Sequence, residues 1–130
     1  MYTLFIDTTK EQSSIKIFQG QAEIRQLTWP SEKRLGQDLL PNIIGLVKQA
    51  HLRLSDIGAV LVCPGPGSFT GSRIGVSVAN SLAWSLHVGV CAADEQNLAQ
   101  ILEKLSDNTS FVSVVTPYYD RPASTTLRST

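Results

Sequence analysis

Hydrophobic and polar residues alternate in the first part of the chain. The run 2–7 is apolar, and the segments 14–18 and 22–27 place apolar residues at every second position. Alternation with a period of two is typical of β-strands, and Gln19-Gly20 supplies a turn between the second and third segments. Three short strands in close succession favour an antiparallel meander. The pattern therefore predicts that the chain begins with three antiparallel strands.

Apolar residues recur at helical spacing in three later segments, 37–51, 73–87 and 98–105. The runs 59–63 and 88–92 lie between them and are short and apolar, as expected of buried strands. The predicted order is βββαβαβα in a mixed five-stranded sheet, with the later strands joined in parallel through right-handed crossovers. This α/β arrangement is the ribonuclease-H-like topology, which also forms each lobe of actin-like ATPases and sugar kinases.

Two of the predicted helices carry more apolar surface than one core requires. The apolar residues of 37–51 cover roughly 160° of a helical wheel, whereas a surface helix needs a stripe of roughly 100°. In 73–87, Trp84 falls on the otherwise polar side, where it either folds over its own surface or anchors a partner helix. The pattern favours a partner surface on both helices, with the candidate contact residues Leu39, Leu40, Ile43, Val47, Arg73, Ser77, Asn80 and Trp84.

A turn rich in glycine and proline, 64–71, joins the strand at 59–63 to the following helix. Unpaired backbone N–H groups at a helix N-terminus suit an anion, but the spacing matches neither common phosphate-binding fingerprint. The same residues also suit a tight turn with close packing of the helix on the sheet. Both interpretations stay open, and the candidate anion-binding residues are Gly65, Gly67, Ser68, Thr70 and Gly71.

Few side chains in the sequence indicate catalysis. Asp7, at the end of the first predicted strand, is either a carboxylate beside a phosphate or metal, or a cap for the following turn. His51 and His87 are the only histidines, and neither belongs to a metal-ligand cluster. We therefore expect no catalytic residue, no metal site and no cofactor.

Composition limits the kinds of partner the chain can bind and indicates its cellular compartment. Eleven basic and eleven acidic residues balance, so the chain has no basic field to hold nucleic acid by itself. No segment approaches the roughly twenty apolar residues of a membrane span, and no signal peptide is recognisable. Cys63 and Cys91 lie in apolar runs, as expected of reduced core residues. We expect one cytoplasmic domain over 1–116, followed by a serine- and threonine-rich tail over 117–130.

Three motifs together resemble the TsaB family, also called YeaZ. They are Ile6-Asp7-Thr8-Thr9, Leu39-Leu40-Pro41 and the long segment from Gly65 to Gly75, and they occur in the family's order. Members of that family support the synthesis of threonylcarbamoyladenosine in tRNA. The resemblance covers roughly residues 1 to 105, which correspond to the family's amino-terminal lobe, and the second lobe is absent.

The resemblance implies a non-catalytic scaffold that pairs with TsaD, the subunit that transfers the threonylcarbamoyl group. The pairing would use the helices 37–51 and 73–87, with a TsaE-like ATPase as a further partner and only indirect contact with tRNA. An alternative is a single-lobe actin-like ATPase or phosphotransferase relative that binds phosphate at the glycine loop with Asp7. A third possibility is a homodimer through the same two helices when TsaD is absent.

Overall fold

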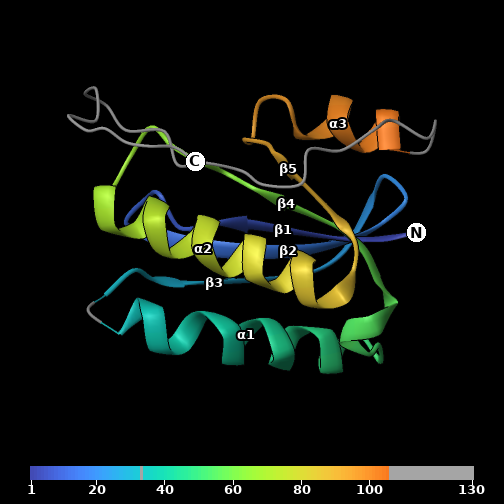
Figure 1. The fold of residues 1–130 in the computed structure, drawn as a ribbon, viewed down its shortest axis with the longest axis horizontal. Coiled ribbons are helices and arrows are strands. Elements are labelled where there is room, and N and C mark those ends of the chain that lie inside the picture. Colours follow the sequence, from blue (N-terminus) through green and yellow to red (C-terminus); the bar gives the residue numbers. More distant parts are fainter. Residues whose placement is uncertain (33, 106–130) are drawn as a thin grey trace.

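A five-stranded sheet in the order β3-β2-β1-β4-β5 forms the centre of the fold (Figure 1). This computed structural model describes residues 1–32 and 34–105. The first three strands pair antiparallel to one another, whereas β4 pairs parallel to β1, and β5 pairs parallel to β4. The strands are β1 (Tyr2–Asp7), β2 (Gln12–Gln19), β3 (Ala22–Pro30), β4 (Ile57–Val62) and β5 (Gly89–Ala92).

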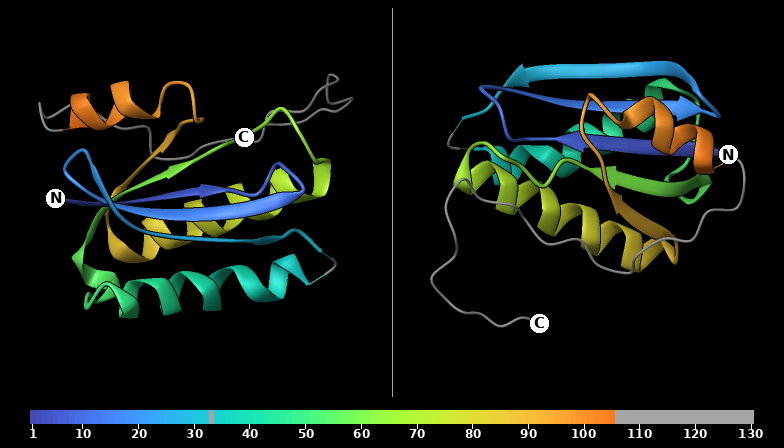
Figure 2. Two further views of the ribbon diagram at one scale, coloured as in Figure 1. Left: turned by 180° about the vertical axis from the view of Figure 1, so that it is seen from behind. Right: turned by 90° about the horizontal axis from the view of Figure 1, so that it is seen from above.

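Helices cover both faces of the sheet, two on one face and one on the other. The helices α1 (Leu35–Gln49) and α2 (Phe69–Leu86) lie side by side on one face, and α3 (Leu98–Leu105) lies on the opposite face (Figures 1 and 2). A short 3₁₀-helix, η1 (Leu54–Asp56), precedes β4. The observed order of strands and α-helices confirms the predicted βββαβαβα. No helix within these described ranges is long and apolar enough to cross a membrane.

The central strands are apolar on both faces because each face packs against helices. Along β1, Leu4 and Ile6 face α1 and α2, whereas Phe5 between them faces α3. The same alternation in β4 divides its residues between the two layers, which explains its continuous apolar run. The larger layer also contains Ile15, Ile17, Leu39, Ile43, Val60, Val62, Val76 and Ala79, and the smaller one Leu61, Leu98, Leu102 and Leu105.

Several element boundaries differ from the sequence-based expectation. The strand β3 continues to Pro30, because Trp29 and Pro30 still pair with β2, and proline is tolerated on an edge strand. The helix α1 begins at Leu35, so Pro41 lies inside it. The helix α2 begins at Phe69 because Ser68 caps it. The expected tail 117–130 lies outside the described residues.

Each of the two long helices is followed within two residues by a histidine in the left-handed conformation. His51 has a φ of 60° and His87 has a φ of 58°. After α2, the N–H of His87 bonds to the Trp84 carbonyl and that of Val88 to the Ala83 carbonyl, so the turn is fixed by the backbone. A residue with a Cβ is strained in this conformation, and glycine is not. The two histidines are therefore local weak points of the fold.

We expect His87→Gly to stabilise the chain relative to His87→Ala by about 1 kcal/mol, because only glycine adopts this φ without strain. His87→Ala is the matched control, since both variants remove the imidazole. The free energy of unfolding is measured by urea titration. Equal stability of the two variants would contradict the assignment of strain to this position.

Candidate functional site

The glycine loop packs against the turn that follows β1. Gly67 has a φ of 156°, and a Cβ added there would overlap the backbone of Thr9. A Cβ at Gly71 would overlap the carbonyl oxygen of Thr8, and one at Gly75 would overlap the Thr8 hydroxyl oxygen. These three glycines therefore allow α2 to approach the end of β1 at backbone distance.

Polar groups of this loop form hydrogen bonds within the protein. The Thr8 hydroxyl donates to the Gly71 carbonyl at 2.6 Å, and the Ser68 N–H donates to the Thr9 carbonyl at 2.9 Å. The Gly71 N–H donates to the Ser68 hydroxyl oxygen at 3.1 Å. A backbone N–H that is already bonded is not free to hold an anion. The contacts favour the packing interpretation of the loop over anion binding.

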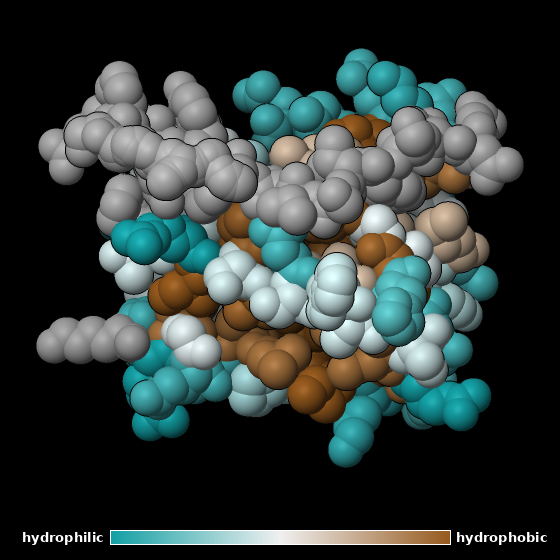
Figure 3. Space-filling view, in the orientation of Figure 1, coloured by the Kyte–Doolittle hydropathy of each residue, from teal (hydrophilic) through white to brown (hydrophobic). Residues whose placement is uncertain are grey.

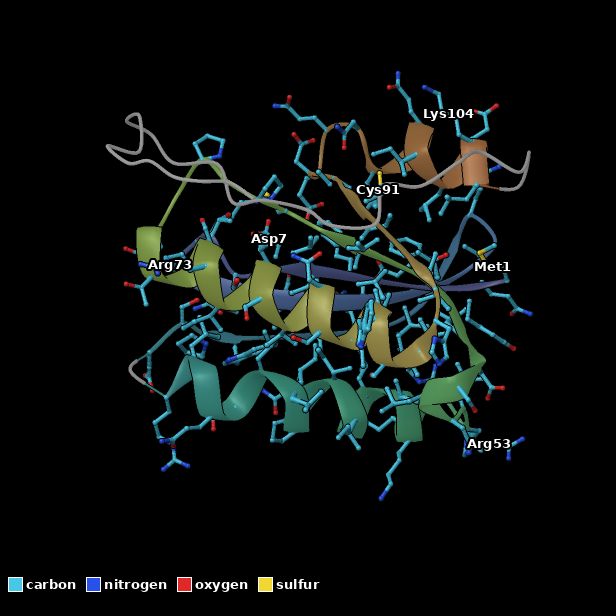
Figure 4. All side chains as sticks on the ribbon, in the orientation of Figure 1. Met1, Asp7, Arg53, Arg73, Cys91 and Lys104 are labelled. Atoms are coloured by element: carbon cyan, nitrogen blue, oxygen red, sulfur yellow. The ribbon has the colours of Figure 1, made fainter. Side chains whose placement is uncertain are left out.

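Asp7 holds the turn to which the loop binds (Figure 4). Its side chain is 2% exposed, and its Oδ1 accepts hydrogen bonds from the N–H and the hydroxyl of Thr9, at 3.0 and 2.7 Å. Its Oδ2 lies 3.5 Å from the Lys10 ammonium nitrogen. Of the two interpretations of Asp7, these bonds favour the cap of the turn. A buried carboxylate bonded in this way also places Thr8 against Gly71.

A cleft of about 360 Å³ opens beside Asp7, at the carboxyl ends of β1 and β4. Among the described residues that line it are three carboxylates, those of Asp7, Asp94 and Glu95, and one lysine, Lys10, while Lys16 lies 3.4 Å from Glu95. This excess of negative charge opposes the binding of a phosphate that brings no cation. Within residues 1–32 and 34–105, no group of three or more His, Cys, Asp or Glu side chains could hold a metal ion.

Cys63 lines the same cleft but does not have the properties of a nucleophile. Burial raises the pKa of its thiol, and the negative charge of Asp7 raises this pKa further. The thiolate is the reactive form of cysteine, and a raised pKa reduces its population at neutral pH. The thiol of Cys63 therefore remains protonated, as expected of a core residue. Burial also raises the pKa of the Cys91 thiol.

Large apolar side chains are exposed on the outer side of α1 and α2. Trp84 is 83% exposed, Leu40 is 41% exposed and Ile44 is 37% exposed. In α1, Leu40 and Ile44 continue the line of Gly36, against which Ile74 of α2 lies, so they border the groove between the helices. Figure 3 shows apolar residues gathered along the region between α2 and α1. We call this surface the outer face, formed by Leu40, Ile44, Ser77, Ser81 and Trp84.

Three predicted contact residues are corrected by the structure. Leu39, Ile43 and Val47 are buried in the larger core layer, with at most 2% of each residue exposed. The wide apolar sector of α1 packs against both the sheet and α2, so the burial of these residues leaves them little surface for a partner. Leu40 and Trp84 are exposed as the prediction requires. The remaining predicted residues lie on α2, where Arg73 and Ser77 are exposed and Asn80 is partly buried (Figure 4).

Ile44 is a member of the outer face that the sequence-based prediction missed. It follows Leu40 by one helical turn, and this spacing was the signal that could have identified it. A helical wheel places Ile44 at the edge of the apolar sector. Only the position of α2 decides which edge of that sector remains exposed.

Comparison with known protein families identifies the class of protein. Residues 31–113 match the family model described as TsaD: tRNA N6-adenosine threonylcarbamoyltransferase. This match includes α1, the glycine loop and α2, so it covers both the candidate loop and the outer face. The chain belongs to this family.

Individual relatives place the chain within the TsaB, or YeaZ, branch of the family, as the motifs predicted. It is 30% identical over 121 residues to the tRNA threonylcarbamoyladenosine biosynthesis protein TsaB of Bacillus subtilis, covering 92% of this chain and 50% of that protein. It is 36% identical over 84 residues to the protein of the same name from Escherichia coli, covering 64% of this chain and 36% of that protein. The chain spans half or less of these curated relatives.

A solved structure confirms the fold class. YeaZ from Pseudomonas aeruginosa superimposes with a TM-score of 0.66 at 30% sequence identity, over 72% of this chain and 43% of that protein. The mixed sheet with helices on both faces is therefore the ribonuclease-H-like, actin-like lobe expected from the order of elements.

We expect Gly71→Ala to destabilise the chain by more than about 2 kcal/mol, because the new methyl group would displace the Thr8 backbone. Gly45→Ala in α1 is the matched control. No atom lies within 4 Å of its added Cβ, so this change should stabilise the helix by up to about 1 kcal/mol. Urea unfolding of both variants checks the prediction, and a neutral Gly71→Ala would contradict the close packing.

Proposed function

We propose that this chain is a non-catalytic scaffold that pairs with a TsaD-like subunit in the threonylcarbamoyladenosine modification of tRNA. The outer face of α1 and α2 is the contact surface. The single observation that carries the proposal is the exposure of Trp84, at 83%, on the helix next to the one that carries the exposed Leu40 and Ile44. The TsaB relatives from Bacillus subtilis and Escherichia coli are both named as biosynthesis proteins of threonylcarbamoyladenosine in tRNA. These names support the assignment of the chain to this modification.

Trp84 is expected to supply most of the binding free energy at the outer face. A tryptophan buries roughly 150–250 Å² in an interface, which at about 25 cal/mol per Å² corresponds to about 4–6 kcal/mol before the costs of association. Leu40 and Ile44 are already more than half buried and add less. Tryptophan is also among the residues most often found as anchors of interfaces. We therefore assign Trp84 the role of anchor and the two aliphatic residues the role of its apolar surroundings.

The type of partner follows from charge and from the family. With eleven basic and eleven acidic residues, the chain is suited to contact a protein directly and tRNA only through that protein. A transferase of the same family would carry an equivalent lobe, with two helices on the same face of its sheet. Two such lobes can pair through like helices, and a TsaE-like ATPase would join the assembly.

The proposal assigns the chemistry to the partner. In this chain burial raises the pKa of the Cys63 thiol, and polar groups of the glycine loop are bonded to one another and to the turn after β1. The TsaD-like subunit would supply the nucleotide site, the metal and the transfer of the threonylcarbamoyl group. Without that subunit, a second copy of this chain could cover the outer face and form a homodimer.

A second candidate function is a single-lobe ATPase or phosphotransferase. The cleft beside Asp7 favours it, because ligands of open α/β sheets bind at the carboxyl ends of the strands. The carboxylates of Asp94 and Glu95 oppose it, since a triphosphate would need cations to approach them. The scaffold remains the better-supported function.

Replacing the anchor provides the main test. We expect Trp84→Ala to weaken binding to the cognate TsaD-like subunit by roughly 30-fold or more, the loss typical of an interface anchor. Its melting temperature should stay that of the unmodified chain, because an exposed side chain contributes little to the monomer's core. Isothermal titration calorimetry measures the affinity.

The control for this test is Gln100→Ala, on the opposite face of the sheet, which should bind like the unmodified chain. Equal affinity of Trp84→Ala and Gln100→Ala would reject the outer face as the contact surface. If the unmodified chain forms no complex at micromolar concentration, the scaffold proposal itself fails.

Calorimetry with ATP and Mg²⁺ separates the two candidate functions. We expect no binding in the micromolar range, because one lobe does not enclose a nucleotide and the cleft carries excess negative charge. Binding that is tight in the unmodified chain and lost in Asp7→Asn would favour the ATPase alternative. The Asp7→Asn variant must be checked for folding by circular dichroism, since Asp7 also holds the turn after β1.

A further inference from the structure

The helix α1 lacks one backbone hydrogen bond on its solvent side. Pro41 lies inside the helix and has no N–H, so the carbonyl of Gln37 loses its regular donor one turn later. Gln37 and Pro41 are both exposed. Leu40 and Ile44 are their neighbours on the helix surface, so this carbonyl borders the outer face.

Burial in the core does not explain the position of Pro41, because the residue is exposed. Its ring is exposed, and proline in a helix interior disfavours the helix. Alanine would support α1 better at this site. A proline inside α1 thus disfavours the helix at the surface to which we assign a partner. Residues that oppose the local structure in this way are expected at functional sites.

Docking changes the surroundings of this carbonyl. In the free chain, water can hydrogen bond to an exposed carbonyl oxygen. An apolar partner surface seated on Leu40 and Ile44 would remove that water, and an unpaired buried carbonyl would reduce affinity by roughly five- to hundredfold. A partner that binds tightly must therefore bring a donor to this position.

We propose that the TsaD-like subunit places a side-chain N–H donor against the backbone carbonyl of Gln37. This inference rests on the proposed function and names a recognition contact within it. The contact lies beside Leu40 and Ile44, where bound apolar groups exclude water and strengthen a hydrogen bond. Its direction along the helix axis would fix the register of the two subunits, which apolar contacts alone do not fix.

The test restores the missing N–H in α1. Pro41→Ala and Pro41→Val both provide a backbone donor to the Gln37 carbonyl, and valine also keeps the apolar bulk of the proline. We expect both variants to weaken binding of the TsaD-like subunit by roughly three- to tenfold, the effect of one hydrogen bond. Pro41→Ala should also raise the melting temperature of the chain alone. Affinity is measured by titration calorimetry with the full 130-residue chain.

Gly45→Ala is the control for helix stability, because it strengthens α1 without adding a contact or a donor at the outer face. It should bind like the unmodified chain, and a loss of affinity equal to that of the Pro41 variants would overturn the inference. Unchanged affinity in both Pro41 variants, or a loss in Pro41→Ala alone, would also overturn it while leaving the scaffold proposal intact. Failure of the unmodified chain to bind would overturn both.

Discussion

The contact between the turn after β1 and the start of α2 is the constraint on which the structure depends. The Thr8 hydroxyl and the Gly71 carbonyl are separated by 63 positions in sequence and lie 2.6 Å apart. The bonds from Asp7 to Thr9 hold one side of this contact, and the absence of a Cβ at Gly71 permits the other. Because the first turn of α2 is fixed in this way, the rotation of the helix is fixed too, and Trp84 is directed to solvent.

The second constraint is the sharing of one core layer by α1 and α2. Leu39 and Ile43 fill the space between the sheet and the two helices, which consumes most of the apolar sector of α1. The large apolar side chains that remain exposed on the two helices are Leu40 and Ile44 of α1 and Trp84 of α2. The outer face is thus small, and a single aromatic side chain accounts for most of its apolar area.

Periodicity predicted the order of strands and helices because each element has a regular apolar pattern. It did not predict the ends of β3 and α2, which are set by strand pairing at Pro30 and by the cap at Ser68. A helical wheel gives the width of an apolar sector but does not show which elements pack against it. For this reason Leu39 was assigned to a partner instead of the core. The role of the glycine loop also depends on a contact with Thr8, which is distant in sequence and has no local pattern.

The shared direction of α1 and α2 has an electrostatic consequence for association. Both helices run the same way across the sheet (Figure 1), so their peptide dipoles add instead of cancelling. The positive dipole ends of both helices lie at one end of the outer face, where Arg34 is paired with Asp38, and the negative ends lie at the other, near Lys48 of α1 and His87. A second lobe of the same construction meets this polarity best when it is turned end for end. Such an arrangement has the approximate two-fold symmetry of a pair of like subunits.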